Sequence, residues 1–297
     1  MQISDFKVTL LGTGTPNPTA DRFGPSTLVE AGTQKLVIDA GRGVPIRLWQ
    51  LKVPVGQIDA LLLTHFHSDH TAGIPDLWLT GWIQTPWGGR TTPFRVIGPM
   101  GTKSLMSNLE SAYALDIKIR IADEENPPLG VAVVAEEFTK DGVVYAKDGV
   151  RVIAFEVDHG DLIKPAYGYR VEYRAKSVVI SGDTRFDENV VKYGIGADVL
   201  IHEVSIAKPE ARNAPIVQSI LAHHTSPREC GIVFDRAKPT LAVYTHISRP
   251  FTATVPAASI NELIAQTRET YVGPLEVGED LMAFEIGDAV IVHRPSR

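Results

Sequence analysis

The sequence predicts an α/β fold in which strands and helices alternate along one chain. Short runs of β-branched and other apolar residues, bounded by Gly, Pro or Asp, are typical of strands. Several of these runs are almost entirely apolar, which indicates strands covered on both faces. Segments with the apolar spacing of helices lie between them, and no linker, repeat or low-complexity tract interrupts the 297 residues. We therefore expect a single layered domain that spans residues 1–297.

In chain order, strands are predicted at residues 6–11, 36–38, 60–63, 94–97, 150–157, 167–173, 177–180, 199–201 and 241–244. Two further strands are expected at residues 281–286 and 289–293. Helices are predicted at residues 44–51, 101–113, 227–237 and 257–271. The third helix is marked by Ser226 as a cap, by Pro227 in the first turn and by Glu229. Residues 122–147 are weakly patterned, and we expect them to leave the core as an excursion with the form of a hairpin.

The composition excludes several classes of protein. Lys and Arg number 29 against 35 Asp and Glu, a net charge of −6, which argues against a surface that binds nucleic acid over its whole extent. The single Cys230 excludes a disulfide scaffold and a Cys-rich zinc or iron–sulfur site. The first residues show no basic segment followed by an apolar run, and no apolar stretch approaches about 18 residues. We therefore expect a cytoplasmic protein without a membrane span.

Four side chains that bind metals in other proteins follow the predicted strand at 60–63. Residues 64–70 read THFHSDH, and loops at the carboxyl ends of strands are where α/β sheets usually place their sites. His65 and His67 are two positions apart, so they project to the same side of an extended backbone. Asp69 and His70 lie where the chain turns and can face a second point. The spacing therefore indicates two metal ions.

This segment resembles the HxHxDH signature of the metallo-β-lactamase superfamily. The resemblance implies an αββα sandwich, with two mixed β-sheets packed face to face, helices on the outer faces and a metal site at one edge. Residues that match the family's further positions each follow a predicted strand: Asp39, His159, Asp183 and His246. The matches extend from Leu10 to His246, so they cover most of the chain.

The resemblance implies seven metal ligands that are shared between two ions. One ion would take His65, His67 and His159, the other would take Asp69, His70 and His246, and Asp183 would bridge both. Imidazole and carboxylate ligands without thiolate suit Zn²⁺, although Mn²⁺, Fe²⁺ or Co²⁺ would also fit. Each ion would keep an open position, which is typical of a catalytic rather than a structural site. Asp39 matches the family's aspartate that supports the ligands.

Three segments indicate which branch of the superfamily this chain resembles. Residues 10–16, LLGTGTP, with Arg22 and Ser26, resemble the opening of ribonuclease Z. Residues 202–205, HEVS, and 223–226, HHTS, are similar to paired loops that ribonuclease Z shares with zinc arylsulfatases.

The loop similarity implies roles for two residues in departure of the leaving group. His224 would donate a proton to the departing oxygen, and Glu203 would hold its imidazole in one tautomer and raise its pKa. His202 is expected to be structural, His223 to be a neighbour without a chemical role, and His293 to be an ordinary strand residue.

One departure from ribonuclease Z affects the expected substrate. Ribonuclease Z inserts a long basic arm, which clamps tRNA, between the third histidine ligand and the bridging aspartate. Here His159 and Asp183 are only 24 positions apart, and two predicted strands at 166–173 and 176–180 fill the interval. This interval leaves no room for the arm. The acidic net charge also argues against binding of tRNA, because phosphate contacts dominate the affinity of proteins for nucleic acids.

A cluster of tryptophans favours a small substrate. Trp78, Trp82 and Trp87 are three of the four Trp in the chain. Trp78 and Trp82 are four positions apart and are expected to pack in the core. Trp87 lies in a turn rich in Pro and Gly, and we expect it to line the entrance and bind substrate, since an aromatic mouth suits small aryl esters.

Together these observations predict a two-metal hydrolase that cleaves phosphodiester or sulfate ester bonds of small molecules. The resemblance implies that a metal-bound hydroxide attacks phosphorus or sulfur, with Asp69 and Asp183 positioning it. Three alternatives remain: a tRNA 3′ endonuclease like ribonuclease Z, with basic surface from a partner subunit; a lactonase or β-lactamase-type hydrolase; and a metal-binding module without catalysis. Family members are often dimers, so a homodimer is expected.

Overall fold

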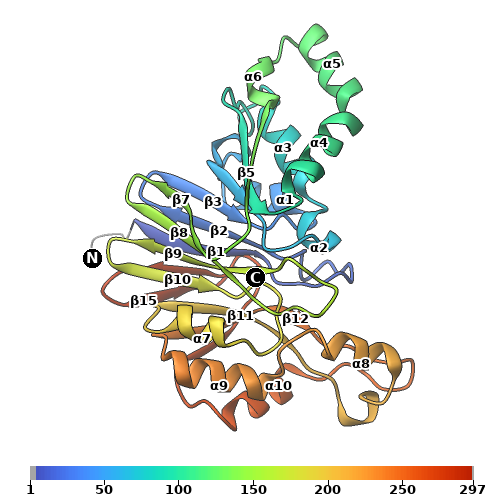
Figure 1. Ribbon diagram of the computed structural model, residues 1–297, viewed down its shortest axis with the longest axis vertical. Coiled ribbons are helices and arrows are strands. Elements are labelled where there is room, and N and C mark those ends of the chain that lie inside the picture. The colour runs from blue at the N-terminus through green and yellow to red at the C-terminus, as the bar shows by residue number, and fades with distance from the viewer. Residues whose placement is uncertain (1–4, 296–297) are drawn as a thin grey trace.

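Two mixed β-sheets packed face to face form the centre of the protein in the computed structural model, which describes residues 5–295 (Figure 1). The eight-stranded sheet has the order β15 (Val290–His293), β14 (Ala283–Ile286), β1 (Phe6–Gly12), β2 (Ser26–Ala31), β3 (Gln34–Ile38), β4 (Ala60–Leu62), β5 (Phe94–Pro99) and β6 (Val133–Phe138). The seven-stranded sheet has the order β13 (Leu275–Val277), β12 (Leu241–Ser248), β11 (Val199–Ser205), β10 (Lys176–Ile180), β9 (Tyr167–Tyr173), β8 (Val150–Glu156) and β7 (Gly142–Lys147). The predicted α/β class with two mixed sheets is confirmed.

The helices form two groups, one with each sheet. The helical segments that follow strands of the eight-stranded sheet are α1 (Val44–Gln50), η1 (Val55–Gln57), α2 (Ser68–Thr71), α3 (Ile74–Trp82), α4 (Thr102–Ala112), α5 (Ala114–Asp123) and α6 (Pro128–Val131). Those that follow strands of the seven-stranded sheet are α7 (Glu188–Gly194), η2 (Pro209–Ala211), α8 (Pro215–Leu221), α9 (Pro227–Ala237) and α10 (Ile260–Arg268). Figure 1 shows α7, α9 and α10 beside the seven-stranded sheet, and α5 at the far end of the molecule. Within residues 5–295, no helix is long and apolar enough to cross a membrane.

Alternation along the strands explains the layers. In β10, Val178 and Ile180 pack between the two sheets, whereas Val179 packs on the outer side, in the same apolar cluster as α9. Successive side chains of a strand point to opposite faces, so a strand covered on both sides needs an unbroken apolar run. On the outer side of the other sheet, Trp78 and Trp82 of α3 are fully buried, as predicted for core residues.

The prediction for residues 122–147 as a hairpin excursion is wrong. β6 pairs in parallel with β5 at the edge of the eight-stranded sheet, and β7 pairs antiparallel with β8 at the edge of the other sheet. The chain therefore passes from one sheet to the other within this segment. Its patterning is weak because edge strands bury little: every residue of β6 keeps some exposure.

Helix ends follow capping chemistry. α9 occupies the predicted residues 227–237 and begins with a capping box between Ser226 and Glu229. The helix predicted at 257–271 begins later, at Ile260, because Ser259 and Glu262 form a second capping box that fixes the first turn. The interval between the predicted third histidine ligand and the bridging aspartate contains β9 and β10, which pair antiparallel as predicted.

Candidate metal centre

Strands of both sheets bring the predicted ligands to one edge of the sandwich. His65 follows β4 of the eight-stranded sheet, whereas His159 follows β8 and Asp183 follows β10 of the seven-stranded sheet. His246 lies near the carboxyl end of β12. The carboxyl ends of β4, β8, β10 and β12 therefore supply residues far apart in the sequence to one place.

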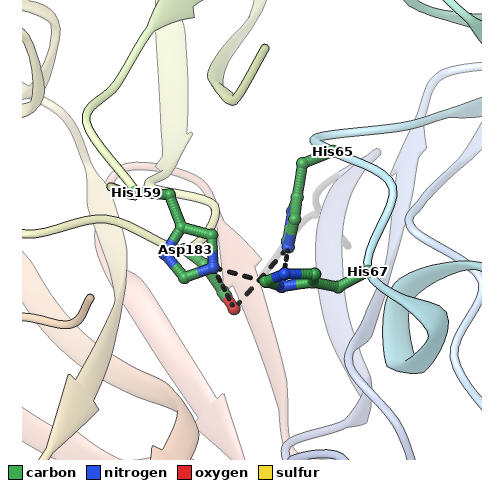
Figure 2. A group of neighbouring side chains, drawn as sticks. All are labelled: His65, His67, His159 and Asp183. Atoms are coloured by element: carbon green, nitrogen blue, oxygen red, sulfur yellow. Dashed lines mark hydrogen bonds and ion pairs between the residues drawn. The ribbon is translucent and has the colours of Figure 1, made fainter. Parts of the chain in front are cut away.

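The first group consists of His65, His67, His159 and Asp183, whose side chains point toward one another (Figure 2). His65 and His67 come from the loop between β4 and α2, and the other two come from loops after β8 and β10. The distance from His65 Nε2 to His67 Nδ1 is 3.0 Å, and that from His67 Nδ1 to His159 Nε2 is 3.2 Å. Asp183 Oδ2 lies 3.9 Å from His65 Nε2 and 3.7 Å from His159 Nε2. His67 is exposed, and the other three are buried.

The second group consists of Asp69, His70 and His246, all buried. The single turn of α2 carries Asp69 and His70. Asp69 Oδ2 lies 3.3 Å from His246 Nε2 and 3.7 Å from His70 Nε2. Asp183 Oδ2 is 3.3 Å from His70 Nε2 and 3.2 Å from His246 Nε2, so this carboxylate faces both groups.

Two observations test whether divalent cations fit these groups. The Nε2 atom of His70 is buried and has no hydrogen-bond partner, although it faces the carboxylates of Asp69 and Asp183. Nitrogen ligands about 2.05 Å from a tetrahedral Zn²⁺ lie about 3.3 Å apart, which is close to the 3.0 and 3.2 Å between nitrogens in the first group. The residues fit two cations bound by nitrogen and carboxylate ligands.

The electrostatics of the first group favour neutral imidazoles, the form that binds metals. Burial holds the pKa of His65 well below its usual range, and the neighbouring His70 adds to the effect. Burial also lowers the pKa of His67 and brings the pKa of His159 to about 4. Three imidazoles that resist protonation at neutral pH leave their nitrogen lone pairs available to a cation.

The second group favours a positive charge at its centre. Burial opposes protonation of His70, yet the carboxylates of Asp183 and Asp39 raise its pKa well above the usual range. Burial also opposes ionisation of Asp183, but His246 and His70 hold the pKa of this carboxyl well below its usual range. A positive charge therefore stabilises the buried carboxylates of this group. A metal ion can provide this charge, and without one a proton on His70 provides it.

The backbone conformation helps to orient two residues at this site, His246 and Asp39. His246 has φ of 42° and lies at an irregularity where the pairing of β11 with β12 shifts register. Such a bulge re-aims a side chain and is common beside active sites. Asp39, at the end of β3, has φ of 57°. A left-handed conformation of a non-glycine residue persists only where its surroundings hold it, as at a functional site.

Asp39 connects the ligand loop to the sheet. Its Oδ1 accepts the backbone N–H of Thr64 at 2.8 Å, and its Oδ2 accepts the Thr64 hydroxyl at 2.7 Å. Oδ2 also lies 2.7 Å from His70 Nδ1. A carboxylate that accepts the proton of one ring nitrogen fixes the tautomer in which the other nitrogen faces the metal. The supporting position predicted for Asp39 agrees with this geometry.

Replacing Asp39 with Asn will weaken metal binding by about 10- to 100-fold, because the carboxylate that orients His70 is lost. Titration of the metal-free protein with Zn²⁺ in competition with a chromophoric chelator measures this affinity. Asp76→Asn is the matched control, since Asp76 lies exposed on α3 and accepts a hydrogen bond from Thr80 of the same helix. Equal affinities of the two variants would contradict the role of Asp39.

His224 and Glu203 form a hydrogen-bonded pair next to the two groups. Glu203 Oε2 lies 3.1 Å from His224 Nδ1, and Glu203 Oε1 accepts the backbone N–H of Thr225 at 2.8 Å. The His224 ring lies 5.4 Å from that of His246, and one of its nitrogens is within 4.8 Å of the ligand atoms of Asp183 and His246. Burial opposes protonation, but Glu203 raises the pKa of His224 to about 9. The geometry suits a proton donor.

Three histidines lie outside the two groups and the His224–Glu203 pair: His202, His223 and His293. His202 is buried, and its Nδ1 lies 2.6 Å from the Glu203 carbonyl oxygen. His293 is exposed on β15, 3.2 Å from Glu285. The carbonyl oxygen of His223 lies 2.8 Å from His159 Nδ1, so its backbone orients a predicted ligand. A backbone contact leaves no residue-type signal, and the sequence therefore could not indicate it.

Trp87 does not lie beside the two groups. Its ring packs against that of Trp49 on α1, with centroids 6.1 Å apart, and its carbonyl accepts the N–H of Gly56. Trp87 follows α3 in the sequence, whereas the ligand loop precedes this helix. The structure gives the expected aromatic entrance no support.

Comparisons with known proteins identify similar chains. Residues 34–247 match the family described as "Beta-lactamase superfamily domain". Ribonuclease Z of Mycolicibacterium gilvum is 35% identical over 96% of this chain and 98% of its own length. The human short form of tRNase Z covers 93% of this chain and 98% of its own, with a TM-score of 0.69 and 21% identity. The metallo-beta-lactamase fold protein YhfI of Bacillus subtilis superposes with a TM-score of 0.70 at 18% identity, covering 94% of this chain and 98% of its own.

Proposed function

This chain belongs to the β-lactamase superfamily and to the ribonuclease Z family, and we propose from this that it is an endonuclease that cleaves the 3′ end of tRNA precursors. The observation that carries the proposal is the 35% identity to a protein named ribonuclease Z, which extends over nearly all of both chains. The coarser conclusion, a metal-dependent hydrolase, follows from the family and from the two groups of His and Asp residues.

This proposal replaces the small-molecule ester hydrolase that the sequence favoured. The absence of a long arm was the first reason against tRNA. However, the relative from Mycolicibacterium gilvum aligns over 98% of its length with 96% of this chain, so it has no room for a long additional arm either. The second reason was the net charge of −6. Net charge describes the whole surface and does not exclude a local group of cations at the site.

In the proposed reaction, the chain's own residues orient the phosphodiester and move protons. Bound divalent cations would supply Lewis acidity and an activated water molecule. Asp69, in the second group, and Asp183, which faces both groups, would orient the attacking water and accept its proton. His224, protonated through its contact with Glu203, would donate a proton to the oxygen of the departing ribose. A ribose alkoxide is a poor leaving group, so this donation is needed.

Cleavage of a tRNA precursor tests the proposal. A transcript with a 3′ trailer, incubated with the Zn²⁺-loaded protein, is expected to release the trailer as a discrete fragment. The same tRNA without a trailer is the substrate control. Mass spectrometry of the fragments identifies the bond, since transfer of a proton to the ribose oxygen leaves a 3′ hydroxyl on one fragment and a phosphate on the other.

The proposal would be contradicted if the protein left this transcript intact but hydrolysed bis(p-nitrophenyl) phosphate or an aryl sulfate. That result would favour a hydrolase of small phosphodiesters or sulfate esters. Hydrolysis of lactones alone would favour the lactonase or β-lactamase-type hydrolase. Metal content measured on the same sample ensures that an inactive preparation is not taken for a negative result.

A further inference from the structure

Residues 278–282, which connect β13 with β14, contain a buried carboxylate outside the two groups of predicted ligands. Oδ1 of Asp280 accepts the backbone N–H of Thr13 at 2.9 Å and the Thr13 hydroxyl at 2.8 Å. Oδ2 accepts the backbone N–H of Phe23 and Nη2 of Arg47, both at 2.7 Å. A carboxylate offers about four lone-pair sites, and contacts within the protein occupy them here.

Thr13 connects this carboxylate to a predicted metal ligand. It follows directly on β1 of the eight-stranded sheet and is fully buried. Its carbonyl oxygen accepts the backbone N–H of Ile247 at 3.1 Å, one position after His246 in β12 of the other sheet. The path of hydrogen bonds from Asp280 to the chain beside the ligand therefore passes through one residue, and it joins the two sheets.

The contact with Thr13 lies at the bulge that contains His246. Glu203 of β11 lies opposite Thr245, whereas the next residue of β11 lies opposite Ile247. His246 is therefore the extra residue of β12, and its side chain leaves the regular alternation of the strand. Its φ of 42° is a conformation that a non-glycine residue keeps only where the surroundings hold it. The carbonyl oxygen of Thr13 holds the residue that follows.

The segment that contains Asp280 also holds β12 before the bulge. The N–H of Gly278 donates to the carbonyl oxygen of Tyr244 at 2.9 Å, two positions before His246. The carbonyl oxygen of Gly278 accepts Nη1 of Arg22 at 2.7 Å, and the same Nη1 donates to Oγ1 of Thr13. The segment therefore contacts β12 directly on one side of the bulge and through Thr13 on the other.

We propose that Asp280 is a positioning residue of the metal centre, which acts through Thr13 to fix the bulge that orients His246 toward the second cation. Asp280 itself would touch neither metal nor substrate, because its oxygens are occupied by Thr13, Phe23 and Arg47. The inference rests on the predicted ligand set and therefore on the proposed function. It does not depend on which phosphodiester is cleaved.

The alternative is that Asp280 only stabilises the fold, and Asp198 provides the matched control. Asp198 accepts the backbone N–H of Ser177 at 2.8 Å and pairs with Lys176 at 3.3 Å, so it makes the same kinds of contact. It precedes the amino end of β11, whereas His246 lies near the carboxyl end of the parallel strand β12. Loss of this carboxylate should therefore affect stability without affecting the metal centre.

Titration of the metal-free protein with Zn²⁺ in competition with a chromophoric chelator tests the inference. Asp280→Asn is expected to weaken binding of one Zn²⁺ about tenfold, the lower end of the range for residues that orient a ligand, because it acts through Thr13. Binding of the other Zn²⁺ should stay within about twofold. His246→Ala identifies which of the two ions belongs to the second group. Asp198→Asn should change neither affinity, and thermal unfolding compares the stability of the variants.

Thr13→Val tests the path between Asp280 and the bulge. Valine has nearly the shape of threonine but cannot donate to Asp280, so binding of the same Zn²⁺ should weaken severalfold. The double variant Asp280→Asn/Thr13→Val should be weakened by less than the product of the two single effects, because both act through one contact. Thr13→Ser keeps the hydroxyl and should bind both ions like the wild type. This series tests the inference even if Asp280→Asn does not fold.

The outcomes separate the inference from the proposed function. If the wild type binds two Zn²⁺ and Asp280→Asn binds them as tightly as Asp198→Asn does, the inference is overturned and the proposed function is unaffected. Equal weakening of both ions in Asp280→Asn would also overturn it, since the carboxylate would then act on the fold as a whole. A wild-type protein that binds no Zn²⁺ would contradict the metal centre and the proposed function together.

Discussion

Replacing Asp183 with Ala will abolish hydrolysis of any phosphodiester and remove most of the bound metal. Asp183 Oδ2 lies within 3.2–3.9 Å of His65, His70, His159 and His246, so its loss affects both groups at once. Metal ions contribute several kcal/mol of transition-state stabilisation, so a decrease in kcat/KM of about 1,000-fold or more is expected. Metal analysis after dialysis, together with initial rates, measures both effects.

A second variant separates loss of metal from loss of fold. Asp183 is buried, whereas His67 is exposed, so His67→Ala removes one predicted ligand with less effect on packing. It should lose about one metal per chain and nearly all activity. Asp161→Ala, with a side chain that is 90% exposed two positions after His159, should retain both. Full metal content in His67→Ala would contradict the assignment of the first group.

The local part of the site could be predicted from the sequence, because its residues are adjacent. Residues 64–70 place His65, His67, Asp69 and His70 in one loop, and a polar run after an apolar strand indicates a site without any knowledge of the fold. The distant members are different. Nothing in the spacing alone selects His159 or His246, and only the resemblance to a family indicated that their strands end at the same edge.

Features that depend on packing were beyond the sequence. The strands β6 and β7 were missed because edge strands lack the continuous apolar run by which buried strands are recognised. Trp87 is an aromatic residue in a turn, as binding residues often are. Its neighbour in space is nevertheless Trp49 on α1, which the sequence of its own turn does not indicate. Arg249 and Phe251 follow His246 closely in the sequence, yet only the fold brings them into one cavity with Arg22.

The comparisons favour the ribonuclease Z-like alternative over a small-molecule ester hydrolase, which was preferred partly because the net charge of the whole chain was used to judge one site. A net charge of −6 averages over the whole surface, whereas affinity for a strand depends on the cations that face it. The homodimer stays a prediction, as does the identity of the metal. Zn²⁺ suits the nitrogen and carboxylate ligands, but geometry of this kind is shared with Mn²⁺, Fe²⁺ and Co²⁺.

Replacing His224 with Ala will decrease kcat for RNA cleavage by about 100-fold or more, the usual contribution of a general acid. The decrease should be only a few-fold for bis(p-nitrophenyl) phosphate, because nitrophenolate departs without a proton. Metal content should not change, since the seven predicted ligands stay in place and Glu203 favours the protonated form of His224, which does not bind a metal. His293→Ala, which removes an exposed histidine on β15, is the matched control. Loss of metal in His224→Ala would assign this residue as a ligand instead.

The pH dependence of kcat separates acid catalysis by His224 from a structural role. Burial opposes protonation of His224, but Glu203 raises its pKa to about 9, so the imidazole is protonated at neutral pH and can act as an acid. Activity on RNA should therefore fall as the pH rises through the pKa of His224. Glu203→Gln removes the negative charge that raises this pKa, so the alkaline limb should move to lower pH. The limb should disappear in His224→Ala, and a limb unchanged in both variants would show that the proton comes from another group.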